Sequence, residues 1–205
     1  MCAALLAGLG LLAAACSGGS EPGRTGPVST TVAVTTVPAT TTVAASVSPA
    51  TTALVDVLTR RLALAVDIAR TKWNTKAPIE DLAREAQAID AVGQAATVAG
   101  VDAATARRVL QAQIEAGKIV QRSLHEQWTV AGQPPFESVQ DLVTGLRPQL
   151  DEITVQLVTA LRSTGPLPVL SGEAGADAER ALTDRLTGVP RAADAARVAL
   201  APLRA

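Results

Sequence analysis

The chain has 205 residues, and its 18 Lys and Arg residues against 19 Asp and Glu residues give a formal net charge of −1. Without a basic excess to neutralise phosphates, nucleic-acid binding is not expected. The only aromatic residues are Trp73, Trp128 and Phe136, too few for a base-stacking platform or an aromatic cage. By contrast, 48% of the residues are apolar and 41 are alanine, a strong helix former and a poor strand former. The composition predicts an all-α chain.

Residues 1–16 have the features of an export signal. They are uncharged and rich in leucine, and they end in three alanines and Cys16. Such a stretch is too short to span a bilayer. Small residues before a cysteine are typical of the site where bacterial lipoproteins are cleaved and acylated, so we expect lipidation at Cys16 and anchoring to a membrane. The alternative is an ordinary secretory signal cut between the alanines. Both predict export, as an envelope or periplasmic lipoprotein or as a secreted protein.

Residues 17–53 have the composition of a linker. They consist mainly of Thr, Val, Ser, Pro, Ala and Gly, and no charged residue lies between Arg24 and Asp56. Because this segment has no amphipathic period, we expect it to be disordered. No cysteine follows Cys16, so the exported part is expected to be stabilised by its core without a disulfide.

The first two helical patterns carry charges on their apolar faces. Apolar spacing predicts a helix over about residues 53–74, with Arg61 and Lys72 on its apolar stripe. A second helix is predicted from Pro78, as a first-turn proline, and Glu85 interrupts its stripe. Because an unpaired charge in a core costs several kcal/mol, each must lie at a helix end, in an ion pair or beside a polar cavity.

The third helical pattern is predicted from an N-cap at Asp102 to about Trp128. Its apolar stripe contains Gly117 and Gln121, a gap and a neutral amide in the middle of the pattern. A lone His125 near its end lacks the second histidine of a metal-binding pair, so we expect a surface or capping histidine and no metal site.

The remaining elements complete a helical bundle. A fourth helical stretch over about residues 138–162 contains Pro148, so it is kinked there or restarts with Pro148 in its first turn. Two short helices follow, near residues 174–186 and 191–200. We therefore expect a helical domain over residues 54–165 and a C-terminal extension, residues 166–205, that packs on it.

Arg61 and Lys72 define a gap on the first helix. Eleven residues make about three turns, which places the two cations on one face about 16.5 Å apart along the axis. Only Ala65, Ile68 and Ala69 lie between them. Two long cationic side chains above this low floor would leave room for one small anion. The alternative is a structural network of salt bridges.

Four blocks of residues keep a regular register along these helices: Arg61 with Lys72-Trp73, then Pro78 to Glu85, then Gln113-Ile114-Glu115 with Gln121, and Leu146 to Asp151. In the first two blocks, Arg is followed after eleven residues by Lys, after nine more by Asp and after three more by Arg. On these blocks the sequence resembles the all-helical chorismate mutases, and within them the exported branch, over about residues 54–161.

The resemblance implies an enzyme that converts chorismate to prephenate by an intramolecular Claisen rearrangement, without a metal or cofactor. Such an enzyme holds a flexible dianion in its reactive chair conformation and stabilises the negative charge that develops on the ether oxygen. The implied catalytic residues are Arg61, Lys72 and Gln121, with Lys72 and Gln121 donating to that oxygen.

The resemblance also implies a set of substrate-binding residues. Arg61, Arg84 and Arg147 would clamp the two carboxylates, a task suited to bidentate guanidinium groups. Glu85, near Asp81, would accept a hydrogen bond from the ring hydroxyl.

Two positions of the third helix modify this expectation. Gln121 stands where some relatives have a glutamate that must be protonated to donate, whereas an amide donates at any pH. Gly117 stands where the family usually has a Ser or Thr that contacts the substrate. The loss of one neutral hydrogen bond, about 0.5–1.5 kcal/mol, predicts a KM raised by roughly two- to tenfold.

Other functions are compatible with the same residues. A non-catalytic, lipid-anchored helical module could bind a small dianion or a partner protein, and Gly117 favours this reading. Lyase activity on isochorismate is a second alternative, because a pyruvate lyase shares the helical fold and a similar cationic pocket. Small residues at Ala91, Ala95 and Ala99 would permit close packing in a homodimer.

Overall fold

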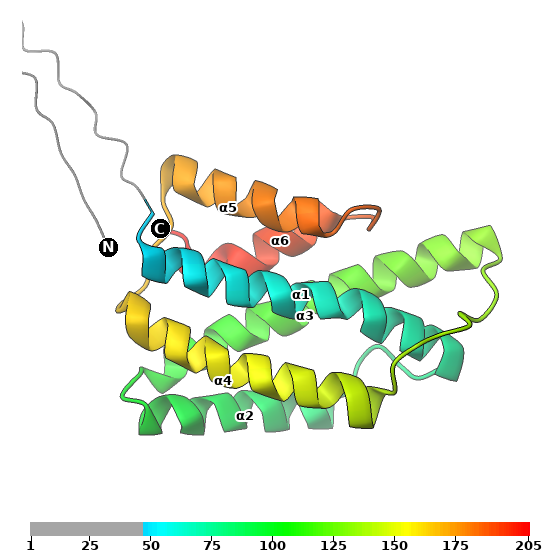
Figure 1. Ribbon diagram of the computed structural model, residues 1–205, viewed down its shortest axis with the longest axis horizontal. Coiled ribbons are helices and arrows are strands. Elements are labelled where there is room, and N and C mark those ends of the chain that lie inside the picture. The colour runs from blue at the N-terminus through cyan, green and yellow to red at the C-terminus, as the bar shows by residue number, and fades with distance from the viewer. Residues whose placement is uncertain (1–46) are drawn as a thin grey trace, which may run out of the picture. The chain divides into compact units, whose positions relative to one another are not determined.

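The computed structural model describes residues 47–205, and this part of the chain is all-α, as predicted (Figure 1). The predicted signal sequence, Cys16 and most of the predicted linker lie outside the described residues. The helices are α1 (Pro49–Thr75), α2 (Leu82–Val98), α3 (Ala103–Ala131), α4 (Arg147–Thr164), α5 (Gly172–Arg185) and α6 (Ala192–Leu200), with a short π-helix η1 (Leu142–Leu146) and a 3₁₀ turn η2 (Ala201–Leu203). No described helix is long and apolar enough to cross a membrane.

Helix α1 begins four residues before the predicted start. The side chain of Ser48 caps it by accepting a hydrogen bond from the Thr51 amide at 3.1 Å, and Pro49 occupies the first turn. These two local signals extend the helix into the end of the segment that composition alone marks as linker. The helix ends at Lys76, which adopts a left-handed conformation with φ of 56°.

Helix α2 begins at Leu82, four residues after the predicted start at Pro78. Asp81 is its N-cap, and the Asp81 carboxylate accepts from the Arg84 amide at 3.1 Å. In return, Glu85 Oε1 accepts from the Asp81 amide at 3.2 Å. This reciprocal cap fixes the helix start at Asp81. The backbone carbonyls of the residues before Asp81 therefore stay outside the helical hydrogen-bond pattern.

Helices α3 and α4 follow the sequence pattern more closely. Asp102 caps α3 as predicted, and the helix ends at Gly132, whose φ of 62° favours glycine. The fourth stretch restarts at Arg147 with Pro148 in its first turn, the second of the two predicted alternatives. The π-helix η1 precedes it directly.

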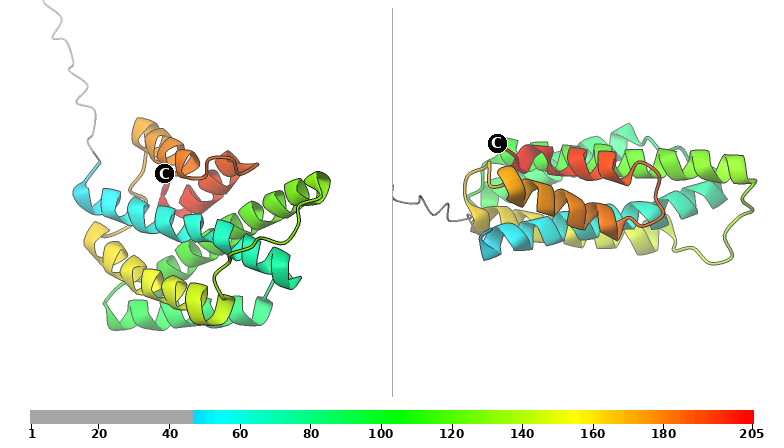
Figure 2. Two further views of the ribbon diagram at one scale, coloured as in Figure 1. Left: turned by 45° about the vertical axis from the view of Figure 1, so that its right-hand side comes forward. Right: turned by 90° about the horizontal axis from the view of Figure 1, so that it is seen from above.

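The helices pack on both sides of α1 and α3, which contact each other. Helices α2 and α4 lie on one side of this pair, and the C-terminal helices α5 and α6 lie on the other (Figures 1 and 2). Apolar side chains with no exposed surface fill the centre, among them Leu54, Leu58, Leu110, Leu157 and Leu200. The end of the chain is held by backbone hydrogen bonds between the segments around Leu170 and Leu203. The C-terminal extension therefore packs on the face of the bundle opposite α2 and α4.

Candidate functional site

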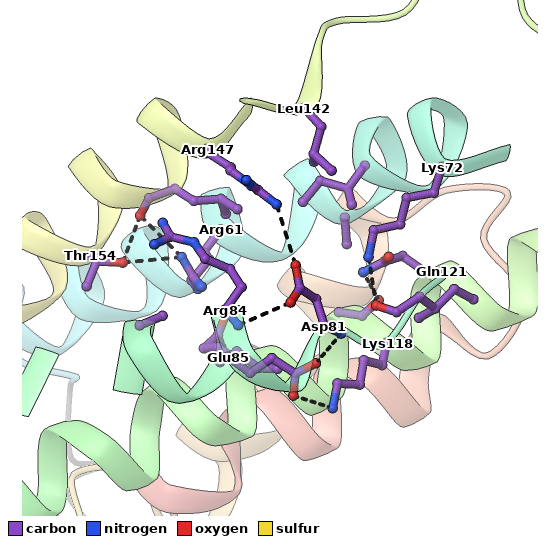
Figure 3. Close-up of a pocket in the computed structure, with 18 of the residues that line it drawn as sticks. Arg61, Lys72, Asp81, Arg84, Glu85, Lys118, Gln121, Leu142, Arg147 and Thr154 are labelled. Atoms are coloured by element: carbon purple, nitrogen blue, oxygen red, sulfur yellow. Dashed lines mark hydrogen bonds and ion pairs between the residues drawn. The ribbon is translucent and has the colours of Figure 1, made fainter. Parts of the chain in front are cut away.

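A cavity of about 150 Å³ lies between α1, α2, α3 and α4 (Figure 3). All eight residues predicted to bind substrate line it: Arg61, Lys72, Asp81, Arg84, Glu85, Gly117, Gln121 and Arg147. Figure 3 shows the three arginines gathered toward one end of the cavity and Lys72 and Gln121 toward the other.

The floor of the cavity on α1 agrees in part with the prediction. Ala65 and Ile68 line the cavity between Arg61 and Lys72, as expected. Ala69 does not line it, because it is fully buried in the core. Each residue turns a helix by about 100°, which carries Ala69 away from the face shared by the two cations.

Arg61 keeps its charge beside neutral partners. Its Nη1 donates to the carbonyl of Leu150 and to Thr154 Oγ1 on α4, both at 3.3 Å. Burial lowers the pKa of Arg61 to about 10, against the opposing effect of nearby Asp151. The guanidinium therefore remains charged at neutral pH without an ion-pair partner in direct contact.

Lys72 is also charged and bonded to a neutral group. The side chain is 8% exposed, and Nζ donates to the Ile79 carbonyl at 2.7 Å. That carbonyl is available because α2 begins only at Leu82. Burial lowers the pKa of Lys72, while the carboxylates of Asp81 and Glu85 oppose the shift. An ammonium group has three N–H donors, so this contact leaves two for a ligand.

Arg84 and Arg147 are paired with carboxylates at the rim. Arg84 Nη2 lies 2.7 Å from Asp151 Oδ1, and Arg147 Nη2 lies 3.5 Å from Asp81 Oδ2. All four side chains are partly exposed to solvent. Because exposed ion pairs contribute little, about 0–1 kcal/mol, a ligand carboxylate can replace either partner at low cost.

The sequence prediction missed Lys118. This lysine lines the cavity with 6% exposure, and its Nζ lies 2.7 Å from Glu85 Oε2 and 2.9 Å from Glu115 Oε1. Burial works against its charged form, but hydrogen bonds to Glu85 and Glu115 outweigh burial and raise the pKa of Lys118. Lysines on helices usually face solvent, so the sequence does not mark Lys118 as a cavity residue. Its place directly after Gly117 is the only signal in the sequence.

Three residues spaced four apart on α3 form the polar wall of the cavity: Gln113, Gly117 and Gln121. Gln121 Nε2 donates to the Gly117 carbonyl at 3.2 Å, and Gln113 Nε2 donates to the Ala199 carbonyl at 3.3 Å. Within the described residues, neither amide oxygen has a hydrogen-bond partner, although both are buried. A Cβ on Gly117 would lie 3.8 Å from the Cβ of Ala65, an ordinary contact, so this glycine leaves open space.

The charge of the cavity differs from that of the chain. Five cationic and three anionic side chains line it, which leaves two net positive charges in a chain whose formal charge is −1. The cations are Arg61, Lys72, Arg84, Lys118 and Arg147, and the anions are Asp81, Glu85 and Asp151. This balance complements a small molecule with two negative charges.

His125 lies in an aromatic cluster, contrary to the predicted surface position. Its ring centroid lies 5.5 Å from that of Trp73 and 5.6 Å from that of Trp128, and its Nε2 lies 2.9 Å from the Ala69 carbonyl. Trp128 also stacks edge-on against Phe136. Within residues 47–205, no group of His, Cys, Asp and Glu side chains could hold a metal ion.

Comparisons with known proteins point to one family. Residues 49–122 match the family model described as chorismate mutase type II. The crystal structure of chorismate mutase from Burkholderia thailandensis is similar at 37% identity and a TM-score of 0.66, over 76% of this chain and 99% of that chain. That of chorismate mutase from Burkholderia phymatum is similar at 29% identity and a TM-score of 0.67, over 76% and 96%. No curated protein sequence matches.

A third structure shares the fold at lower identity. The secreted chorismate mutase from Yersinia pestis is 18% identical, with a TM-score of 0.59 over 73% of this chain and 94% of that chain. Each of the three structures covers 73–76% of this chain, which is more than the predicted domain of residues 54–165 contains. The structural similarity therefore extends beyond the predicted domain.

Proposed function

The chain belongs to the type II chorismate mutase family, and we propose that it is an isomerase that converts chorismate to prephenate in the cavity between α1, α2, α3 and α4. The observation that carries this proposal is the pair of net positive charges on the cavity wall. They match the two carboxylates of chorismate, and Arg61 and Lys72 supply charge that no carboxylate of the described chain neutralises by contact.

The reaction needs only positioning and electrostatic stabilisation. An ether C–O bond breaks while a C–C bond forms within one molecule, so no proton, nucleophile or external electron pair is required. The protein must hold the dianion in its compact reactive chair and stabilise the negative charge that grows on the ether oxygen.

Lys72 and Gln121 are proposed as the donors to the ether oxygen. Lys72 Nζ retains two N–H groups beyond its bond to Ile79, and Gln121 Nε2 retains one beyond its bond to Gly117. Both side chains are buried, so these hydrogen bonds would act in a medium of low dielectric constant, where they are stronger than in water.

Arg61, Arg84 and Arg147 are proposed to clamp the carboxylates. Arg61 is held by neutral partners and needs no exchange. For Arg84 and Arg147, a substrate carboxylate would replace Asp151 and Asp81, respectively. These partly exposed ion pairs keep the two guanidinium groups at the rim until substrate arrives.

Export is proposed from the sequence of residues 1–16, with lipidation of Cys16 as its specific form. A homodimer is also proposed, since Ala91 and Ala95 lie on the exposed surface of α2. Neither proposal alters the chemistry of the cavity, which is built from α1, α2, α3 and α4 of one chain.

One assay distinguishes the candidate functions. Purified protein is incubated with chorismate, whose loss is followed by ultraviolet absorbance, and prephenate is detected after acid conversion to phenylpyruvate. We expect chorismate loss with stoichiometric phenylpyruvate. Stable chorismate would contradict the mutase proposal. A parallel incubation with isochorismate then separates the alternatives: pyruvate release would favour the lyase, and no reaction would favour a non-catalytic binding module.

A further inference from the structure

The mutase mechanism leaves Lys118 without a role, although it is the least exposed cation lining the cavity. Its Nζ bridges Glu85 on α2 and Glu115 on α3. A lysine that only served solubility would extend into solvent, because burial of an ammonium group costs several kcal/mol unless it is paired. The position of Lys118 therefore requires an explanation.

The two carboxylates that contact Lys118 are not equivalent. Glu115 lies one turn away on the same helix, its side chain is about half exposed, and such pairs contribute only a few tenths of a kcal/mol. Glu85 lies on another helix and lines the cavity, and its side chain is mostly buried. The contact with Glu85 is thus the one that links Lys118 to the candidate site.

Glu85 is held at both carboxylate oxygens. Oε1 accepts from the Asp81 amide at 3.2 Å, and Oε2 accepts from Lys118 Nζ at 2.7 Å. A carboxylate has about four lone-pair positions, so two contacts leave acceptor capacity for a ligand hydroxyl. Two anchors from different helices also fix the plane of the group, which a single contact does not do.

We propose that Lys118 is a positioning residue, which orients the Glu85 carboxylate toward the ring hydroxyl of the substrate. This inference rests on the proposed function, because it assigns that hydroxyl to Glu85. Lys118 itself contacts no reacting atom in this account. Its effect passes through Glu85, since the ammonium group is bonded to Glu85 Oε2 and to a second carboxylate outside the cavity lining.

The chain offers a matched control for this proposal. Arg122 lies one turn further along α3 and also pairs with a carboxylate ahead of α2, that of Glu80. Its side chain is 46% exposed, and neither Arg122 nor Glu80 lines the cavity. Arg122→Met therefore removes an equivalent ion pair between the same parts of the fold without touching the site.

The kinetic test is a double-mutant cycle between Lys118 and Glu85. We expect Lys118→Met to lower kcat/KM for chorismate by about 10- to 100-fold, and Arg122→Met to change it less than about twofold. In a Glu85→Ala background, Lys118→Met should cost less than about twofold, because the group that Lys118 orients is absent. An equal cost of Lys118→Met in both backgrounds, or none in wild-type protein, would overturn the proposal.

A second measurement does not depend on activity. In a crystal structure of Lys118→Met, we expect the Glu85 carboxylate to leave the position in which it accepts from the Asp81 amide; an unmoved carboxylate would overturn the proposal. Wild-type protein without mutase activity would instead refute the proposed function, while the crystal structure of Lys118→Met still decides the role of Lys118.

If Lys118→Met is too unstable to crystallise, the double variant Lys118→Met/Glu85→Gln is used in its place, because it leaves no unpaired buried charge. Its crystal structure is then compared with that of Glu85→Gln for movement of the amide introduced at position 85.

Discussion

Gln121→Glu tests whether the Gln121 amide donates to the ether oxygen. The substitution preserves size at a side chain that is 7% exposed. In the parent, Nε2 donates to the Gly117 carbonyl at 3.2 Å and keeps a second N–H. A glutamate can donate only when it is protonated, because an ionised carboxylate has acceptors alone.

The size of the effect follows from burial. Burial raises the pKa of a carboxyl group, although the cations that line this cavity oppose the shift. Above that pKa, the protonated form falls about tenfold with each pH unit. We therefore expect kcat/KM of Gln121→Glu to fall by at least about tenfold between roughly pH 5 and pH 8, whereas Gln121 imposes no such loss on the parent.

Steady-state rates with chorismate across this pH range provide the measurement. Gln111→Glu, on the exposed face of the same helix, is the control for a general effect of added negative charge. If Gln121→Glu has the same pH profile as the parent, Gln121 does not donate to the reacting oxygen.

Three further predictions follow from the cavity. Gly117→Ala should raise Tm by about 1–4 °C, because a helix-interior glycine costs about 0.5–1 kcal/mol and the nearest added contact, to the Cβ of Ala65 at 3.8 Å, is ordinary. An unchanged or lower Tm in a thermal melt would contradict this. Arg147→Ala should lower kcat/KM by about 10- to 100-fold with little change in Tm, because the substrate loses a charged hydrogen bond while the exposed pair with Asp81 contributes little; an intact kcat/KM would refute its clamp role. Burial lowers the pKa of Lys72, and deprotonation removes its charge. We therefore expect kcat/KM to decline as the pH rises, before the pH reaches the range in which an ordinary lysine titrates. A pH profile that stays flat up to that range would contradict this.

The stripe pattern of the helices identified part of the cavity wall from sequence, and the family resemblance added Asp81, Arg84 and Arg147. Arg61, Lys72, Gly117 and Gln121 interrupt apolar stripes, and such interruptions mark places where a core residue faces a cavity. The register could not exclude Ala69 from the same face, because a predicted stripe is wider than the single line of side chains that reaches a cavity.

Two local errors have physical causes. The predicted start of α2 relied on Pro78 as a first-turn proline. In the structure Asp81 caps the helix by accepting from the Arg84 amide, and the Asp81 amide donates to Glu85 Oε1. His125 is three residues before Trp128 on the same helix, so both side chains share a face, but only the packing of α1 against α3 brings Trp73 to them.

Lys118 illustrates what sequence periodicity cannot supply. Its neighbour Glu115, three residues before it, forms the kind of pair that stabilises an exposed helix surface. Lys118 is buried because α2 packs across α3 and brings Glu85 Oε2 within 2.7 Å of Lys118 Nζ. Such a contact between distant segments is a property of the tertiary structure.

The most direct test of the central claim compares the rate of prephenate formation by wild-type protein with that of Lys72→Met. Lys76→Met is the matched control, because Lys76 lies over the ring of Trp73, outside the cavity. The account predicts that wild-type protein and Lys76→Met convert chorismate at similar rates, and that Lys72→Met loses at least about 100-fold in kcat. Equal rates for Lys72→Met and wild-type protein would contradict the claim that this cavity performs the rearrangement.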